Sequence, residues 1–222
     1  MPYVRLLLSD SKASAAISMA TERHLEQVHY LLAATYPNGK ELHHHFGTSA
    51  AVMTLLTIAA ASAIRHFDPK KNKKPRVPTD HDIFTDAVMK FFPWGHISIQ
   101  DDQFRSLGEQ RKAAAEELYS VFRNPLVHLG GITSKPQMSG VVGGWYRSPE
   151  IAHVFPGLSQ QENEAAIENY CQATLSGDLL IKLEALSSTV YTRPLYWCTR
   201  KMIEAFAADS DVQADINRNL AI

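Results

Sequence analysis

The segment YSVFRNPLVHLGG, residues 119–131, decides how this sequence is interpreted. It places an arginine, an amide and an imidazole, Arg123, Asn124 and His128, within one or two turns of backbone. On an uninterrupted α-helix, residues five apart lie roughly 140° apart around the axis, so Arg123 and His128 would not share a face. Proline is poorly tolerated inside a helix but accepted at its first position, so we expect one helix to stop near Arg123, Asn124 to cap, and Pro125 to start a new turn. This break would bring the arginine and the histidine together.

Apolar residues along most of the chain recur at three- and four-residue steps, which predicts helices. Extended structure is expected at 96–100 and at 132–156, where Gly, Pro and Ser are interspersed with β-formers. We therefore predict an all-α fold, an antiparallel helical bundle with a short extended or hairpin insertion around 132–156. The expected helices cover residues 12–35, 40–67, 81–92, 101–122 and 159–186, followed by a last helix that Pro194 starts or kinks and that ends near Asp209. Thr79-Asp80 can cap the helix over 81–92, and Glu117 can face water on the helix over 101–122.

Arg123, four intervening residues and His128, with Asn124 directly after the arginine and helical sequence on both sides, resemble the Arg-X4-6-His signature of the HEPN (higher eukaryotes and prokaryotes nucleotide-binding) superfamily. The order of helices agrees from about Ser49 to Phe206, whereas residue-level matching covers only the segment 119–131. The resemblance implies a metal-independent endoribonuclease whose cleft is shared between the two subunits of a homodimer.

Cleavage of RNA by its own 2′-hydroxyl needs a base for that proton, an acid for the leaving 5′-oxygen, and cations for the charge on the phosphorane. The guanidinium of Arg123 suits the last role because it stays charged and presents a planar fork to phosphate oxygens. His128 suits the acid or the base, and Asn124 would position a phosphate or a ribose hydroxyl. One histidine cannot hold both protonation states at once, so the second copy in a two-fold dimer would supply the other.

Two residues before the motif are also candidates for substrate binding. Tyr119 precedes Arg123 by four residues and Glu116 precedes it by seven, so all three stack on one side of the expected helix. Glu116 and Arg123 could simply pair across the surface or bind neighbouring carbonyls. Alternatively, Tyr119 and Glu116 line the approach to Arg123 and orient its guanidinium.

The stretch DPKKNKKPRVP, residues 68–78, is a basic, proline-bounded linker. Runs of this kind are usually solvated loops, and that interpretation stays open. The alternative is a patch that contacts phosphates, in which Lys73, Lys74 and Arg76 bind substrate.

Length and composition favour one large domain over residues 1–222, with 1–39 as an N-terminal helical extension and 210–222 as a polar tail. The formal charge of −1 gives no global basic field, so contact with RNA or a nucleotide must be local. The most apolar window, 50–64, falls short of the roughly 20 residues that span a bilayer, so we expect no membrane association and a cytoplasmic location. Three adjacent histidines at 43–45 cannot all face one metal on a regular helix, so we assign no metal and no cofactor.

Two other functions remain open. A HEPN-like bundle without activity would serve as a nucleotide-binding, RNA-binding or protein-interaction module with a cognate protein partner. Retention of both Arg123 and His128 argues against that interpretation, and the near-neutral charge argues for it. The third interpretation is a helical protein in which the two side chains only satisfy a buried helix end.

Overall fold

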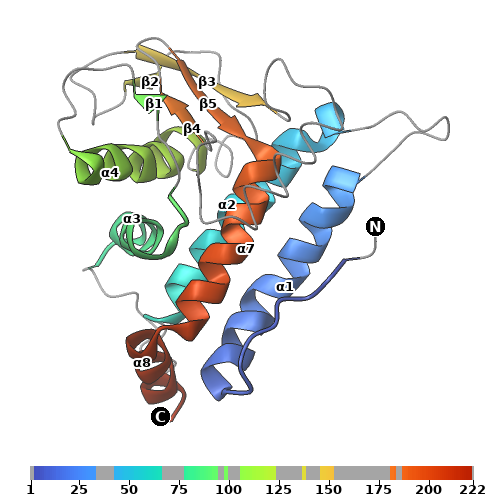
Figure 1. The fold of residues 1–222 in the computed structure, drawn as a ribbon, viewed down its shortest axis with the longest axis vertical. Coiled ribbons are helices and arrows are strands. Elements are labelled where there is room, and N and C mark those ends of the chain that lie inside the picture. The colour runs from blue at the N-terminus through green and yellow to red at the C-terminus, as the bar shows by residue number, and fades with distance from the viewer. Residues whose placement is uncertain are drawn as a thin grey trace.

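The computed structural model describes residues 3–33, 43–66, 78–94, 98–99, 106–123, 137–138, 146–152, 181–183 and 187–221. Its body is a bundle of α-helices, so the predicted helical bundle is confirmed (Figure 1). The α-helices of the described ranges are α1 (Lys12–Ala33), α2 (His43–Ile64), α3 (Asp80–Phe91), α4 (Leu107–Glu117), α7 (Thr192–Ala208) and α8 (Ser210–Leu220).

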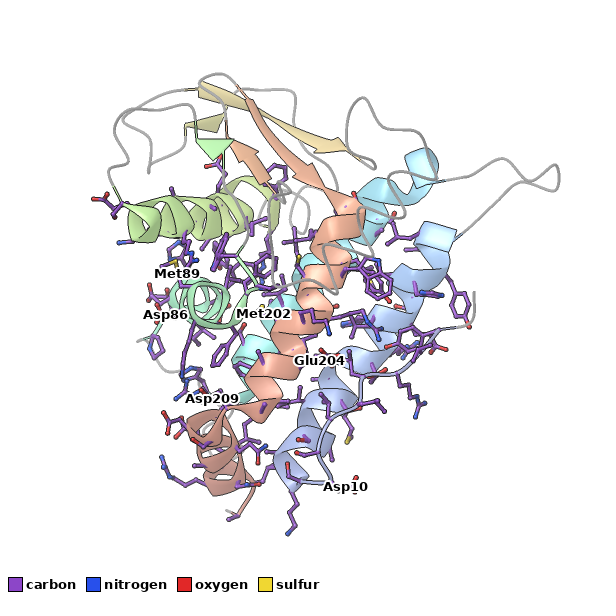
Figure 2. All side chains as sticks on the ribbon, viewed as in Figure 1. Asp10, Asp86, Met89, Met202, Glu204 and Asp209 are labelled. Atoms are coloured by element: carbon purple, nitrogen blue, oxygen red, sulfur yellow. The ribbon has the colours of Figure 1, made fainter. Side chains whose placement is uncertain are left out.

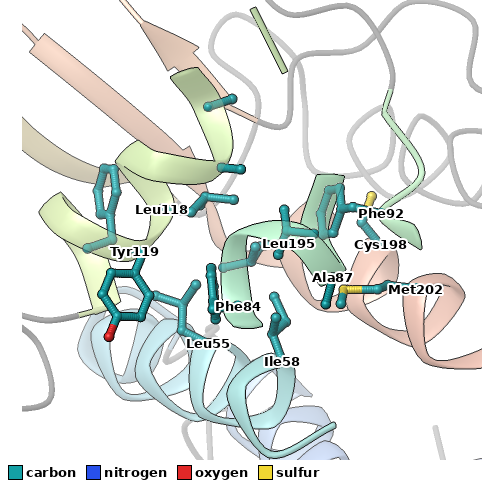
Figure 3. Close-up of a cluster of buried hydrophobic side chains, with 14 of the residues drawn as sticks. Leu55, Ile58, Phe84, Ala87, Phe92, Leu118, Tyr119, Leu195, Cys198 and Met202 are labelled. Atoms are coloured by element: carbon teal, nitrogen blue, oxygen red, sulfur yellow. The ribbon is translucent and has the colours of Figure 1, made fainter. Parts of the chain in front are cut away.

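Helices α2 and α7 form the centre of the bundle, with α1 on one side of the pair and α3 and α4 on the other (Figure 1). On α2, Leu55 and Ile58 pack toward α3, whereas Ala50 and Ala61 pack toward α1. Such a helix must be apolar nearly all round, as the sequence of α2 is. Two clusters of buried side chains result, the α3-side core and, between α1, α2, α7 and α8, the α1-side core. The α3-side core contains Leu55, Ile58, Phe84, Ala87, Val88, Phe92, Trp94, Ala114, Ala115, Leu118, Tyr119, Phe122, Leu195, Cys198 and Met202, most of which Figure 3 shows.

Helix α1 belongs to the main packing of the bundle, although its stretch was predicted as an N-terminal extension. Ile17 and Leu25 on α1 are completely buried in the α1-side core. The segment before α1 is held as well, because Nη2 of Arg200 on α7 donates a hydrogen bond of 2.7 Å to the carbonyl oxygen of Val4. A buried charged donor makes one of the stronger hydrogen bonds in a protein. Residues 3–33 therefore pack on the same core as α7.

Residues 210–220 form helix α8, whereas the sequence predicted a polar tail that frays. Asp209 caps this helix by accepting hydrogen bonds from the backbone N–H groups of Asp211 and Val212. Val212 and Ile216, one helical turn apart, are buried against α1 and α7. A single apolar residue per turn is a weak helix signal in the sequence, but with a good cap it suffices to dock a short helix.

A small sheet covers the end of the bundle beside α4 (Figure 1). The predicted hairpin is confirmed, because β2 pairs antiparallel with β3 through Gln137 opposite Arg147. At 96–100, where the sequence left a short strand and an extended loop open, the structure has strand β1 at Ser98–Ile99. The strand order is β1-β4-β5-β3-β2, from β1 (Ser98–Ile99), β2 (Gln137–Met138), β3 (Tyr146–Ala152), β4 (Ile181–Leu183) and β5 (Ser187–Tyr191).

The helix predicted over 159–186 is wrong at 181–183, which form strand β4. The rest of that range lies outside the described residues. Leu183 is a good helix former and Ile181 a weaker one, but here β4 pairs antiparallel with β5 and parallel with β1. Pairing on both sides outweighs local propensity, which is a weak prior.

Helices α3 and α4 start at capping boxes, which fix where both helices begin. Thr79 accepts a hydrogen bond from the backbone N–H of Asp82, and the Asp82 carboxylate accepts one in return from the Thr79 backbone. Ser106 and Glu109 do the same for α4. The expected start of a helix at Thr79-Asp80 is therefore confirmed.

Candidate nucleic-acid site at the end of α4

The helix that leads into the motif does not end as a regular α-helix. Directly after α4, residues Leu118–Arg123 form a π-helical turn, η1. Such turns are rare, insert one extra residue into the helical repeat, and occur frequently at functional sites. Pro125 follows two residues later in the sequence and has no N–H to donate to the carbonyl of Val121, so a regular helix could not continue through it intact. The structure thus departs from α-helical geometry in the segment where the sequence predicted a break.

Arg123, the last residue of this turn, is held on an aromatic face. Its Cζ atom lies 5.1 Å from the centroid of the Tyr119 ring. A guanidinium at this distance is attracted by the ring quadrupole, typically by about 0.5–2 kcal/mol. Tyr119 itself is only 8% exposed and packs on Phe84 in the α3-side core, as Figure 3 shows. The core therefore fixes the ring, and the ring supports the cation at its edge.

A histidine that the sequence analysis missed lies against the same ring. The imidazole of His81, on the first turn of α3, meets the Tyr119 ring edge to face, with 4.9 Å between centroids and 88° between planes. His81 precedes Phe84 by three residues, so both lie on the face of α3 that packs on Tyr119. Nothing in the spacing between His81 and Tyr119 along the chain could have revealed this contact.

Asp82 lies beside His81 on the solvent side of the first turn. Its Oδ1 atom is 3.5 Å from Nδ1 of His81. Hydrogen bonds from the side chain and backbone of Thr79, with a smaller contribution from His81, lower the pKa of Asp82 below its ordinary value. The carboxylate is therefore ionised at neutral pH and fixes a negative charge next to the imidazole.

The two glutamates before η1 have different environments. Glu116 is half-buried and lies 3.9 Å from Nζ of Lys112, so its ion-pair partner in the described structure is Lys112 and not Arg123. Glu117 was expected to face water, but it is only 1% exposed. The neighbouring residues Ala113, Ala114 and Ala115 are all buried as well, so this helix buries more than one stripe of residues. The expectation for Glu117 was wrong for that reason.

Five of the predicted site residues lie outside the described residues, namely Asn124, His128, Lys73, Lys74 and Arg76. Among the predicted residues that the structure describes, it brings Arg123 and Tyr119 together, and it leaves Glu116 with Lys112.

In the described ranges, no three His, Cys, Asp or Glu side chains are grouped so that they could hold a metal ion. None of the helices there combines the length and the apolar character needed to cross a bilayer.

No protein-family model, curated protein or solved structure matches this chain.

Proposed function

We propose that this protein is a metal-independent endoribonuclease. The observation that carries the proposal is the placement of Arg123, at the end of a π-helical turn and on the face of a buried tyrosine, inside the segment that resembles the HEPN motif. The homodimer and the RNA substrate that the resemblance implies are part of the proposal.

The reaction uses the nucleophile that RNA carries. A base takes the proton from the 2′-hydroxyl, the 2′-oxygen forms a bond to phosphorus, and the bond from phosphorus to the 5′-oxygen breaks. An acid gives a proton to that 5′-oxygen. The products are a 2′,3′-cyclic phosphate and a 5′-hydroxyl, and neither water nor an oxidant is consumed.

Arg123 would stabilise the charge that builds on the phosphate oxygens during this step. A preorganised cation is most effective where its position is fixed before the reaction, because no reorganisation is then needed. Packing on Tyr119 provides that fixation. Asn124, the next residue, would hold a phosphate or ribose oxygen with neutral hydrogen bonds, and His128 would transfer a proton.

Basic residues come shortly before α3 in the sequence. Lys73, Lys74 and Arg76 precede Thr79, the cap of α3, by only three to six residues. The first turn of α3 contacts Tyr119 through His81. RNA phosphates next to the scissile one would therefore meet basic side chains that come within six residues of the cap of α3 in the sequence.

The proposal is tested by incubating the purified protein with a single-stranded oligoribonucleotide in excess chelator and identifying the ends. We expect 2′,3′-cyclic phosphate ends. His128→Ala should abolish cleavage but spare RNA affinity, because the imidazole acts in the transition state. Arg123→Ala should reduce both cleavage and affinity, and Asn124→Ala should cost less than either.

Arg218→Ala is the matched control, since this arginine is on α8 and its side chain is 72% exposed. It should cleave like the wild type. If the wild type shows no cleavage in chelator, or if His128→Ala cleaves as well as the wild type, the ribonuclease proposal fails and the interaction module takes its place.

A further inference from the structure

We infer that His81 is the general base of this site, an inference that rests on the proposed ribonuclease function. The motif contains a single histidine, His128, so the other proton transfer was expected from a second copy of the chain. The fold brings another imidazole, from α3 of the same chain, to the Tyr119 ring over which Arg123 lies.

The distances allow His81 and Arg123 to act on one phosphate. The imidazole centroid is 4.9 Å from the centroid of the Tyr119 ring, and the guanidinium carbon is 5.1 Å from the same point. The two groups are therefore at most about 10 Å apart. A phosphodiester with its ribose hydroxyl spans such a gap when each end makes a hydrogen bond of about 2.8 Å.

The surroundings of His81 orient its ring for proton abstraction. The ionised carboxylate of Asp82 lies 3.5 Å from Nδ1 and favours the tautomer with its proton on that nitrogen. In the described part of the chain, Nε2 makes no hydrogen bond, so its lone pair is available. The side chain is 39% exposed, so a substrate can reach it. An imidazole held by a carboxylate at one nitrogen and open at the other is the usual arrangement of a general base.

Other charged and titratable groups also reach this end of α3. Its own first turn contributes Asp80 and Asp82, and the helix of α4 and η1 contributes Glu116, Tyr119 and Arg123. Arg123 would be neutralised by the substrate phosphate during the reaction, whereas Asp82 remains beside the imidazole.

In the cleavage step, Nε2 of neutral His81 accepts the proton of the 2′-hydroxyl as the 2′-oxygen bonds to phosphorus. The bond to the 5′-oxygen breaks, and that oxygen takes its proton from the acid, for which His128 is the candidate. His81 then returns its proton to solvent.

The experiment compares His81→Gln with the wild type in chelator across pH 5 to 9, and His66→Gln is the control. His66 is exposed, follows α2 and lies near Arg65 and Asp215, so its loss removes an imidazole that makes no ring contact with Tyr119 in the described structure. We expect the wild-type kcat/KM to follow a bell-shaped pH profile. His81→Gln should lower it at least about 100-fold and should lose the acidic limb, on which the base becomes deprotonated. His66→Gln should match the wild type.

A second variant separates chemistry from folding. His81→Ala with added imidazole should recover part of the lost cleavage, because free imidazole can occupy the space and take the proton, and thermal unfolding should show both variants folded. If His81→Gln keeps the wild-type rate and both limbs, or if imidazole restores nothing to a folded His81→Ala, His81 is not the base while the proposed function stands. If the wild type does not cleave at all, the proposed function itself fails and this inference with it.

Discussion

The guanidinium of Arg123 lies over the ring of Tyr119, and the two residues are four apart in a helix that widens into a π-turn between them. Since Tyr119 is buried, its contribution to the site is made through the position of Arg123 and not through contact with RNA.

Replacing the ring tests this relationship. Tyr119→Leu removes the aromatic face, and a loss of about 0.7–2 kcal/mol of cation–π stabilisation predicts a fall in kcat/KM of about 3- to 30-fold. Tyr119→Phe keeps the face and should retain nearly full activity. Phe84→Leu is the packing control, because Phe84 contacts Tyr119 in the same core. It should reduce stability without a comparable loss of kcat/KM. Equal activity of the Phe and Leu variants at position 119 would contradict the relationship.

A second prediction concerns the cap of α8. Partial burial acts to raise the pKa of Asp209, but hydrogen bonds from Nζ of Lys90 and from the backbone N–H groups of Val212 and Asp211 outweigh it and lower the pKa. Figure 2 marks Asp209 at the junction of α7 and α8. A depressed folded-state pKa means that the stabilisation is present above the unfolded value of about 3.9 and is lost as pH falls through the folded value.

Asp209→Ala should therefore lower the free energy of unfolding by about 1 kcal/mol at pH 7, measured by urea denaturation. The gap between wild type and Asp209→Asn, which keeps a capping oxygen but loses the charge, should shrink as pH falls below about 4. A gap that stays constant down to pH 2.5 would show that the charge of Asp209 contributes nothing.

How far the sequence predicts this fold depends on whether a signal is local. The cap of α3 is local, and the start of the helix was predicted at Thr79-Asp80, where the structure has a capping box of Thr79 and Asp82. A helix stop near Arg123, with Asn124 as cap and a new turn at Pro125, was also predicted, and residues 124 and 125 lie outside the described residues. What the structure describes before them is a departure from α-helical geometry. Its form, a π-turn ending at Arg123, could not be predicted because a widened turn has no distinct sequence signature.

Features that depend on tertiary contacts were missed. His81 and Tyr119 are 38 residues apart, and they meet only because α3 packs against η1. Glu117 looked solvent-facing because a single buried stripe was assumed for its helix. Ile181 and Leu183 had a helical pattern until pairing on two sides made them a strand. In each case the deciding partner lies far away in the sequence.

A third prediction concerns the basic linker before α3. Replacing Lys70, Lys71, Lys73, Lys74 and Arg76 with glutamine should weaken RNA binding and flatten its salt dependence. Each lost phosphate contact should reduce the slope of log K against log salt by roughly 0.7 for a single strand. Binding titrations at four salt concentrations measure this slope. An unchanged slope would assign the stretch to a solvated loop.

The last prediction concerns the homodimer, whose interface must lie near Arg123 if two copies of the motif share one cleft. The exposed apolar side chains Leu7 and Met19, 93% and 86% exposed, are on the α1 side of the bundle. The α4 side with η1 is across the α2–α7 pair (Figure 1), so contact through α1 could not bring two copies of Arg123 together.

Sedimentation equilibrium at micromolar concentration should therefore show a dimer that persists in Leu7→Glu and Met19→Glu. Ser120→Glu, at an exposed position of η1, should shift it toward monomer because two added charges would approach across the two-fold axis. A monomeric wild type, or a dimer that dissociates only in the α1-side variants, would remove the shared cleft and leave His81 and His128 of one chain as the two proton-transfer groups.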